Sequence, residues 1–369
     1  MSSFDYLVVG AGFTGATFAR EKAKAGFKVK VIDSRDHMGG NAYDYRHETG
    51  ILIHKYGPHL FHTNSDRVFE WLSQFTGWVP YEHRVMAAWA NGQSLIPVPF
   101  NFRSIDLCFP SWQANIFKSC LAETRTRDNQ RFTLGQLMKS VDHHIVGLGM
   151  FVYENIFKHY TQKMWGMTLD QLGPAVADRV PIIAGYDDRY FADKYQALPV
   201  SGYTMLFKRM LSHENIEFCP STSYEHGMQG DAKLFFTGPI DEYFGYTEGK
   251  LPYRGITFTM AEGSALRNMT GAATLNYTLA DYEHTRATSM RVINGLQTNS
   301  NDVVVCETPN STDKFYPYTH EEARNKYKMY EWAGSAFPDR VRFAGRLGSY
   351  QYLNMDQAVA QALKCAEEF

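Results

Sequence analysis

The chain opens with alternating strand and helix patterns. Residues 6–9 (YLVV) form an apolar run typical of a buried parallel strand. Residues 13–25 have the pattern of a helix that Gly26 closes, and residues 28–32 return to an apolar strand pattern. This order predicts a strand-helix-strand unit of an α/β fold.

The pattern changes twice further along the chain. Residues 100–190 show helical periodicity with polar linkers, which predicts a separate helical domain. Segments 254–259, 272–277 and 302–306 alternate between apolar and polar positions and predict an antiparallel sheet.

Two later segments return to the pattern of the first domain. Residues 233–237 resemble a strand that leads into Gly238-Pro239. Residues 340–347 predict a strand that ends in glycine, and residues 354–368 predict an amphipathic helix after it. Both ends of the chain are therefore expected to serve one domain.

A glycine motif links the first strand to the first helix. Gly10 permits a tight turn, Gly12 lets the backbone approach a phosphate, and Gly15 lets the helix lie close to the strand. Asp33 follows Gly15 by 18 residues, at the end of the next strand, where a carboxylate can bind a ribose diol. Together they predict a dinucleotide site with the pyrophosphate at the helix N-terminus.

A second glycine pair, Gly39-Gly40, follows in the stretch from Arg35 to Asn41. It indicates either a second close approach of the backbone to a bulky cofactor or a flexible surface turn. No second Gly-x-Gly-x-x-Gly motif follows a strand later in the sequence, so a stable NADPH site is not expected.

Composition narrows the possible partners. A formal net charge of −2 argues against general binding to nucleic acid or membrane surfaces, so an anion site must depend on a few local arginines. Five scattered cysteines without a Cys-x-x-Cys pair indicate reduced thiols. The sequence shows no leader pattern and no long apolar run, and we expect a cytoplasmic enzyme without membrane insertion.

Several residues are candidates for chemistry. His54, His59 and His62 suggest either a metal site or, since Gly57-Pro58 marks a loop, histidines beside a cofactor; without a nearby acid or cysteine we predict no metal. Phe157 and Tyr160 share a helix face, where they either sandwich a base or belong to the core.

Several segments together resemble one family, the FAD-dependent bacterial UDP-galactopyranose mutases. The resemblance covers nearly the whole chain and rests on five motifs. These are Gly39-Gly40-Asn41-Ala42-Tyr43, residues 54–63, residues 160–166 (YTQKMWG), residues 237–241 (TGPID) and Gly345-Arg346-Leu347.

The resemblance implies an α/β architecture, α+β overall, with a Rossmann-type FAD domain into which a helical bundle and an antiparallel sheet domain are inserted. The FAD domain would comprise residues 1–80, 196–242 and 330–369. The bundle would comprise residues 100–195 with a mobile loop at 167–181, and the sheet domain residues 81–99 and 243–329.

The resemblance also assigns roles to residues. Arg179, Arg286 and His62 would be catalytic, the two arginines at the diphosphate and the histidine beside the flavin. The substrate-binding set would be Phe157, Tyr160, Trp165, Tyr190, Asn276, Tyr316 and Tyr352. The FAD-binding set would be Gly10, Gly12, Phe13, Gly15, Asp33, Ser34, Arg35, Gly40, Asn41, His59, Arg346 and Met355.

The implied reaction interconverts UDP-galactopyranose and UDP-galactofuranose for the synthesis of cell-surface glycans. The FAD would act in its reduced form, whose N5 forms an adduct with the sugar. The expected partner is a nucleotide-diphosphate hexose, with no nucleic acid, and a homodimer is possible.

Three residues depart from the family pattern. Ser201 replaces a glycine, Ser349 a glutamate and Asn354 an aspartate. The last two would lie near the sugar and flavin, so another hexose, such as UDP-N-acetylgalactosamine or TDP-fucose, stays open. A rival interpretation is an FAD oxidoreductase of the amine-oxidase kind, which shares the N-terminal motif but needs no arginines and tyrosines for a diphosphate.

Overall fold

The structure is a computed structural model that forms two compact units. Unit 1 comprises Met1–Tyr81, Asp193–Gly255 and Ser311–Phe369, and unit 2 comprises Glu82–Ala192 and Ile256–Asn310. The structure describes residues 4–89, 94–124, 130–168, 171, 180–262, 266, 271–296, 302–310, 312–318 and 320–369. Within these ranges no helix is long and apolar enough to cross a membrane.

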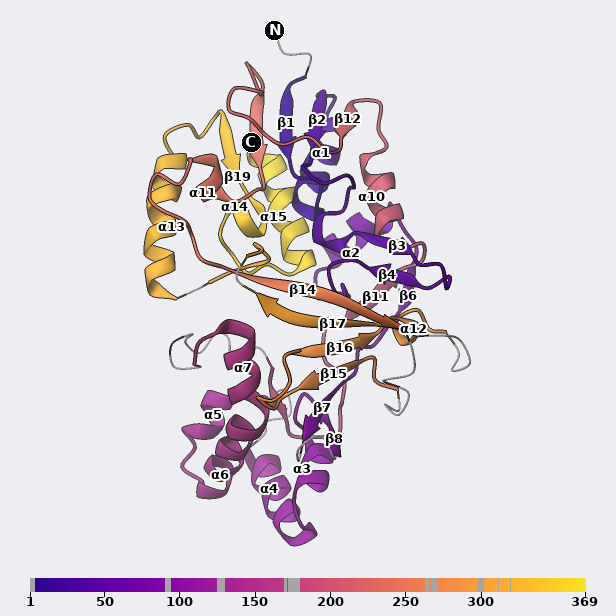
Figure 1. The fold of residues 1–369 in the computed structure, drawn as a ribbon, viewed down its shortest axis with the longest axis vertical. Helices are drawn as coiled ribbons and strands as arrows, with labels where there is room; N and C mark the ends of the chain where they lie inside the picture. Colours follow the sequence, from indigo (N-terminus) through magenta and orange to yellow (C-terminus); the bar gives the residue numbers. More distant parts are fainter. Residues whose placement is uncertain are drawn as a thin grey trace. The chain divides into compact units, whose positions relative to one another are not determined.

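Unit 1 is built on a five-stranded parallel sheet (Figure 1). Its strands, in spatial order, are β12 (Ile216–Cys219), β2 (Val29–Ile32), β1 (Tyr6–Val9), β13 (Lys233–Phe236) and β19 (Val341–Phe343). The apolar run of β1 is buried on both faces, which is why it lacks strict alternation.

Helices cover both faces of this sheet. Helix α1 (Phe13–Lys24) packs beside α15 (Met355–Glu368) and α10 (Tyr203–Leu211) on one face, where Phe18 stacks on Phe235 with ring centroids 3.8 Å apart (Figure 1). On the other face Phe236 and Phe343 meet Tyr243 of α11 (Ile240–Tyr243). Helix α13 (Glu321–Gly334) also contacts β19.

Shorter elements complete unit 1. They are η1 (Gly40–Ala42), β3 (Asp44–Arg46), β4 (Leu52–His54), β5 (Phe61–Thr63), α2 (Asp66–Ser73), β6 (Trp78–Pro80), β11 (Tyr195–Pro199), β18 (Tyr316–Pro317) and α14 (Gly345–Gly348). Strands β5, β11 and β6 form a small antiparallel sheet that includes His62, and β4, which pairs with β3, ends at His54. Of the three histidines only His59 lies in a loop. The expectation that all three are loop histidines was wrong, because edge pairing extends into this Gly-Pro segment.

Unit 2 combines helices with a mixed sheet. The sheet order is β18, β14 (Tyr253–Glu262), β17 (Val303–Asn310), β16 (Arg286–Ser289), β15 (Thr274–Tyr277), β7 (Val85–Trp89) and β8 (Ser94–Val98). Strand β18 and the first residues of β14 belong to unit 1. The sheet was predicted as antiparallel, yet β15 pairs with β7 in parallel. Strands so distant in sequence carry no turn that reveals their relative direction.

Several helices of the described part of unit 2 share one apolar core with this sheet. They are α3 (Phe102–Cys108), α4 (Ser111–Thr124), α5 (Leu134–Met138), α6 (His143–Val152) and the π-helical turn η2 (Tyr153–Phe157). The unit also contains α7 (Lys158–Trp165) and α12 (Met290–Ile293), and strands β9 (Arg131–Phe132) and β10 (Ile182–Ile183) form a separate ribbon. Ile96 and Val85 of the sheet share the core with Leu148 and Val152 of α6. The predicted helical and sheet domains thus belong to one compact unit in this structure.

Candidate functional site

A cavity of about 450 Å³ lies in unit 1, at the carboxyl ends of the strands of the parallel sheet. Loops that follow β1, β2, β12, β13 and β19 all contribute to its wall. This is the edge at which doubly wound α/β proteins bind nucleotides. Every residue of the predicted cofactor set lines it except Gly15. Those residues are Gly10, Gly12, Phe13, Asp33, Ser34, Arg35, Gly40, Asn41, His59, Arg346 and Met355.

Gly10 and Gly15 of the first motif exclude a side chain for different steric reasons. Gly10 has φ of +101°, and a β-carbon there would lie 2.1 Å from Thr237 Oγ1, which is itself held by Val9 O at 2.7 Å. A β-carbon on Gly15 would lie 1.9 Å from the carbonyl oxygen of Gly10. Gly15 therefore sets the distance between α1 and β1 rather than the cavity wall.

The second glycine pair approaches the first. Gly40 has φ of +56°, and a β-carbon on it would lie 3.1 Å from Gly12 Cα. Gly12 is the N-cap of α1 and brings no capping side chain, and the first turn of the helix has no acidic residue. The backbone N–H groups of this turn thus face the cavity without a competing carboxylate, as a pyrophosphate requires. The flexible-turn alternative for Gly39-Gly40 does not describe this ordered approach.

Asp33 connects the two nucleotide-binding loops. Its Oδ2 accepts the N–H of Ala11 at 2.8 Å, and its Oδ1 accepts the N–H of Arg35 at 3.0 Å. Each oxygen keeps a lone pair that a ribose hydroxyl can use. The guanidinium of Arg35 lies 4.4 Å from the ring centroid of Tyr56, and its Nη2 donates to Asn41 Oδ1 at 3.0 Å. These donor and acceptor groups fit a dinucleotide.

Arg346 lies on a pair of aromatic rings. Tyr316 and Tyr352 stack with centroids 4.9 Å apart, and the guanidinium lies 4.8 Å from the Tyr316 ring and 5.5 Å from the Tyr352 ring. Its Nη2 donates to Leu353 O at 2.7 Å and its Nη1 to Phe315 O at 3.3 Å. One residue predicted to bind FAD, Arg346, and two predicted to bind substrate, Tyr316 and Tyr352, therefore form one cluster.

All three histidines of residues 54–63 take part in hydrogen bonds through their rings. His54 Nδ1 accepts the N–H of His59 at 2.9 Å. Burial lowers the pKa of His54 to about 4 and that of His59 to about 3, and the charge of Arg346 acts in the same direction on His59. His62, predicted beside the flavin, lies on β5 with Nδ1 2.9 Å from Asp193 Oδ2 and is not among the cavity residues.

Buried neutral histidines predict a loss of stability in acid. An unfolded histidine titrates near pH 6.5, whereas burial lowers the pKa of His54 to about 4 and that of His83 to about 3. The stability that each neutral histidine contributes is fully present above about pH 6.5. It is lost as the pH falls from there toward the folded-state pKa, because over this range only the unfolded chain gains a proton. We expect each histidine to cost about 2 kcal/mol of unfolding free energy between pH 7 and pH 5.

Urea unfolding at pH 7, 6 and 5 measures this loss. In His54→Asn the amide oxygen replaces Nδ1 as the acceptor, so the pH slope should become shallower. His143→Asn changes an exposed histidine of α6 and serves as the control. An unchanged slope in His54→Asn would contradict the assignment.

A second polar cluster, in unit 2, surrounds Arg286. Its Nη2 donates to Tyr160 Oη at 2.9 Å, and its Nε lies 3.3 Å from Glu307 Oε2. Asn276 faces Arg286 directly across the β15–β16 pair. The structure thus brings two predicted substrate-binding residues, Tyr160 and Asn276, together with Arg286, which was predicted to be catalytic.

Burial controls the protonation of the neighbours of Arg286. It raises the pKa of Tyr160 to about 12 and raises the pKa of Glu307, while the charge of Arg286 opposes both shifts. It lowers the pKa of His83 to about 3, with Arg286 adding to the effect. Tyr160 is therefore a neutral hydroxyl, and it still has one hydrogen to donate after accepting from Arg286.

The remaining predicted substrate residues are distributed around unit 2. The ring of Tyr190 lies 5.8 Å from that of His83, and its N–H donates to His83 O at 2.8 Å. Phe157 is 8% exposed and belongs to the core, and Trp165 is buried at the end of α7. Arg179 and most of the predicted loop 167–181 lie outside the described residues.

Sequence reasoning did not select Glu307 and His83. Glu307 occupies a buried position of β17, where an acid needs a partner charge. In the sequence, the signal for a buried acid is the position of Glu307 directly after the apolar run of residues 303–306. Its partner Arg286 is 21 residues away, so the sequence does not reveal the ion pair.

The family departures have local explanations. Ser201 is exposed. The position in this turn that requires glycine is the next one, Gly202, whose φ is +81°. Ser349 Oγ donates to Gly345 O at 2.7 Å, and Gln361 Oε1 accepts the N–H of Gly345 at 2.7 Å. Asn354 is the N-cap of α15 and lines the cavity.

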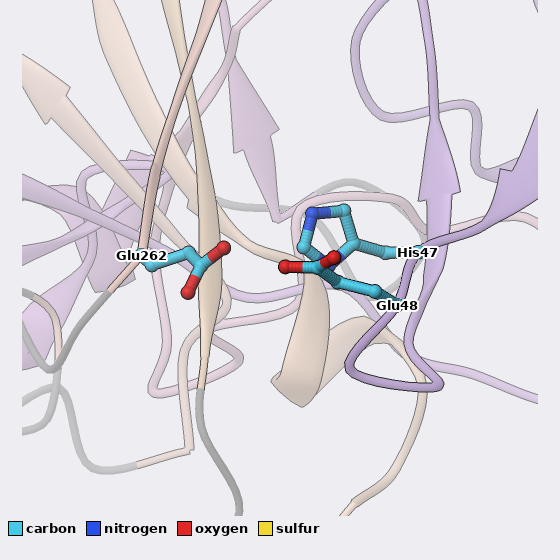
Figure 2. Close-up of side chains that lie close together, drawn as sticks. All are labelled: His47, Glu48 and Glu262. Atoms are coloured by element: carbon cyan, nitrogen blue, oxygen red, sulfur yellow. The ribbon is translucent and has the colours of Figure 1, made fainter.

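Three possible metal ligands, His47, Glu48 and Glu262, lie outside these clusters. Figure 2 shows His47 and Glu48, which lie on the turn between β3 and β4. His47 Nδ1 lies 3.0 Å from Thr49 Oγ1 and accepts the N–H of Thr49 at 3.3 Å, so this nitrogen serves the turn itself. Glu262, drawn in the same figure, is exposed at the end of β14 in unit 2. We assign no ion to these side chains.

Comparison with known proteins identifies the relatives of the chain. Residues 155–352 match the model of the UDP-galactopyranose mutase family, and residues 8–75 match that of the NAD(P)-binding Rossmann-like domain. A probable UDP-galactopyranose mutase of Klebsiella pneumoniae is 32% identical, with 100% of this chain and 95% of the relative covered. A dTDP-fucopyranose mutase of Escherichia coli is also 32% identical, with 98% and 97% covered.

Solved structures agree on the fold. The crystal structure of a reduced UDP-galactopyranose mutase matches with a TM-score of 0.71 at 15% identity, covering 100% of this chain and 94% of the other. A putative protoporphyrinogen oxidase from Exiguobacterium matches with a TM-score of 0.64 at 14% identity, covering 100% and 99%. The predicted α/β fold with a Rossmann-type domain and the predicted family are confirmed. The chain belongs to the UDP-galactopyranose mutase family and is an isomerase.

Proposed function

We propose that this enzyme interconverts the pyranose and furanose forms of a nucleotide-diphosphate hexose, with UDP-galactose as the first candidate and reduced FAD as the cofactor. The observation that carries the proposal is the Arg286–Tyr160 pair, a cation and a neutral hydroxyl held 2.9 Å apart in a largely buried setting. Such a pair suits a diphosphate, for which an amine oxidase has no use.

The residues of the cavity would hold the dinucleotide. The N–H groups at the start of α1 would bind its pyrophosphate, and Asp33 would accept hydrogen bonds from a ribose. Gly10, Gly12 and Gly40 all line the cavity, and their lack of side chains supports this fit because it leaves the backbone open to a phosphate. When bound and reduced, the flavin would supply an electron-rich N5 as the nucleophile for the anomeric carbon.

The arginines and tyrosines would stabilise the leaving diphosphate. Negative charge grows on it as the anomeric bond breaks, so cations placed there bind the transition state more tightly than the ground state. Arg286 would place a positive charge at the leaving diphosphate, and Arg179 would provide a second one. The predicted substrate-binding tyrosines Tyr316 and Tyr352 carry hydroxyls that can donate hydrogen bonds to a phosphate. All five cysteines are unpaired thiols, which supports a reducing cytoplasmic location.

Another hexose is a specific second candidate. The dTDP-fucopyranose mutase of Escherichia coli is as similar in identity as the Klebsiella relative. Ser349 and Asn354 stand where the family usually has acids, and Asn354 lines the cavity. TDP-fucose and UDP-N-acetylgalactosamine therefore remain alternatives to UDP-galactose.

Turnover by the dithionite-reduced holoenzyme on UDP-galactose, UDP-N-acetylgalactosamine and TDP-fucose tests the proposal. We expect furanose product from at least one of them, no activity with strictly oxidised flavin, and no stoichiometric consumption of NADPH. Full activity of the oxidised enzyme would contradict the proposed role of reduced FAD. Oxidation of an amine with release of hydrogen peroxide would favour the oxidase alternative.

A further inference from the structure

Lys163 contacts the segment that leads to Arg286. Its Nζ lies 2.7 Å from Tyr277 O, 2.8 Å from Leu279 O, 3.0 Å from Tyr282 O and 3.2 Å from His284 O. All four acceptors are main-chain carbonyls: Tyr277 is the last residue of β15, and the other three residues lie in the loop between β15 and β16. The first two lie on the outgoing side of this loop and the last two on the returning side.

The loop needs such an anchor. Residues 280–283 at its tip are exposed, and the N–H of Tyr277 donates to Thr285 O at 2.9 Å where the two strands join. Four carbonyl dipoles that converge on one point repel each other unless a cation lies between them. The ammonium of Lys163 supplies this charge with three N–H donors.

Lys163 and Tyr160 lie three residues apart on α7, on the same face of the helix. Tyr160 accepts from Arg286 Nη2, while Lys163 binds the loop that ends immediately before Arg286. Helix α7 thus fixes both the guanidinium of Arg286 and the backbone that leads to it. Because this loop leads directly into Arg286, a shift of its carbonyls would also shift the backbone of the arginine.

We propose that Lys163 is a positioning residue: by binding the carbonyls of Tyr277, Leu279, Tyr282 and His284 it holds Arg286 where it meets the substrate diphosphate. This inference rests on the proposed function. Lys163 does not touch the substrate itself; it acts through Arg286 and Tyr160. Burial lowers the pKa of Lys163 to about 8, so the side chain is charged at neutral pH.

The first test measures UDP binding and steady-state kinetics of Lys163→Met holoenzyme. We expect the Kd for UDP and the KM for the nucleotide sugar to rise about tenfold or more, as when one charge-assisted contact to the ligand is misplaced, with unchanged flavin content. Lys163→Arg should recover part of the affinity. Lys158→Met removes a lysine of the same helix that pairs with Glu154 at 2.7 Å, and it should behave as wild type.

The outcomes separate the two proposals. Wild-type affinity and KM in Lys163→Met would overturn this inference alone. A wild-type holoenzyme that binds neither UDP nor TDP would overturn the proposed function and this inference with it.

A second test asks whether the cation itself matters. Lys163→Ala leaves the four carbonyls facing an empty position that an ammonium ion can occupy. We expect ammonium chloride to lower the KM of Lys163→Ala, whereas tetramethylammonium chloride, which is too large and has no N–H donor, should not. Equal effects of the two salts would contradict the role of the ammonium group.

Discussion

Replacing Arg286 with alanine is expected to lower kcat/KM for the nucleotide sugar by about 10- to 150-fold while the flavin stays bound. A charge-assisted hydrogen bond to phosphate contributes about 1.5–3 kcal/mol, which converts to this range. The flavin should stay because the predicted cofactor residues belong to unit 1 and Arg286 belongs to unit 2. Kinetics of the reduced holoenzyme and its flavin absorbance measure the two effects.

Glu307 complicates this variant and also provides its control. Without Arg286, the buried carboxyl of Glu307 loses its counter-charge, so Arg286→Ala should also lower the melting temperature. The double variant Arg286→Ala, Glu307→Gln should recover stability but not activity, because the amide needs no counter-charge. Arg103→Ala removes an exposed arginine of unit 2 and should change neither. Near-wild-type kcat/KM in Arg286→Ala would remove Arg286 from the diphosphate site.

The dinucleotide half of the molecule was predictable because its determinants are local. Gly10, Gly12, Gly15 and Asp33 lie within one strand-helix-strand unit, and each has a steric or hydrogen-bonding reason that follows from its spacing. The predicted strand 6–9 and the helix near the C-terminus also match β1 and α15. Because the contacting residues of such a unit are close in sequence, few other folds are compatible with the pattern.

The Arg286 cluster was only partly predictable because its contacts are long-range. Arg286 meets Tyr160 across 126 residues, and its ion pair with Glu307 joins two strands whose register no local pattern specifies. The parallel pairing of β15 with β7 was missed for the same reason. Phe157 ends the π-helical turn η2 and belongs to the apolar core, whereas Tyr160 lies in α7 and contacts Arg286, so the two residues have different partners.

The largest effect is expected from one methyl group, in Gly15→Ala. A β-carbon at this position would lie 1.9 Å from the carbonyl oxygen of Gly10. Because this oxygen belongs to the main chain, no side-chain rotation can relieve the clash, and α1 must move away from β1. This movement displaces the N–H groups of the first helical turn by more than a hydrogen bond tolerates. Losing one or two charge-assisted hydrogen bonds to a pyrophosphate should weaken cofactor binding by about 100-fold or more.

Flavin content after purification, titration of the apoprotein with FAD and the melting temperature measure the effect of Gly15→Ala. Overpacking should also lower the stability of unit 1 by about 1–3 kcal/mol. Gly147→Ala makes the same change inside α6 of unit 2, where a β-carbon meets nothing within 4 Å. That variant should gain up to about 1 kcal/mol from helix propensity and keep its flavin. If Gly15→Ala instead retained full flavin and the wild-type melting temperature, the close approach of α1 to β1 would not be what forms the pyrophosphate site.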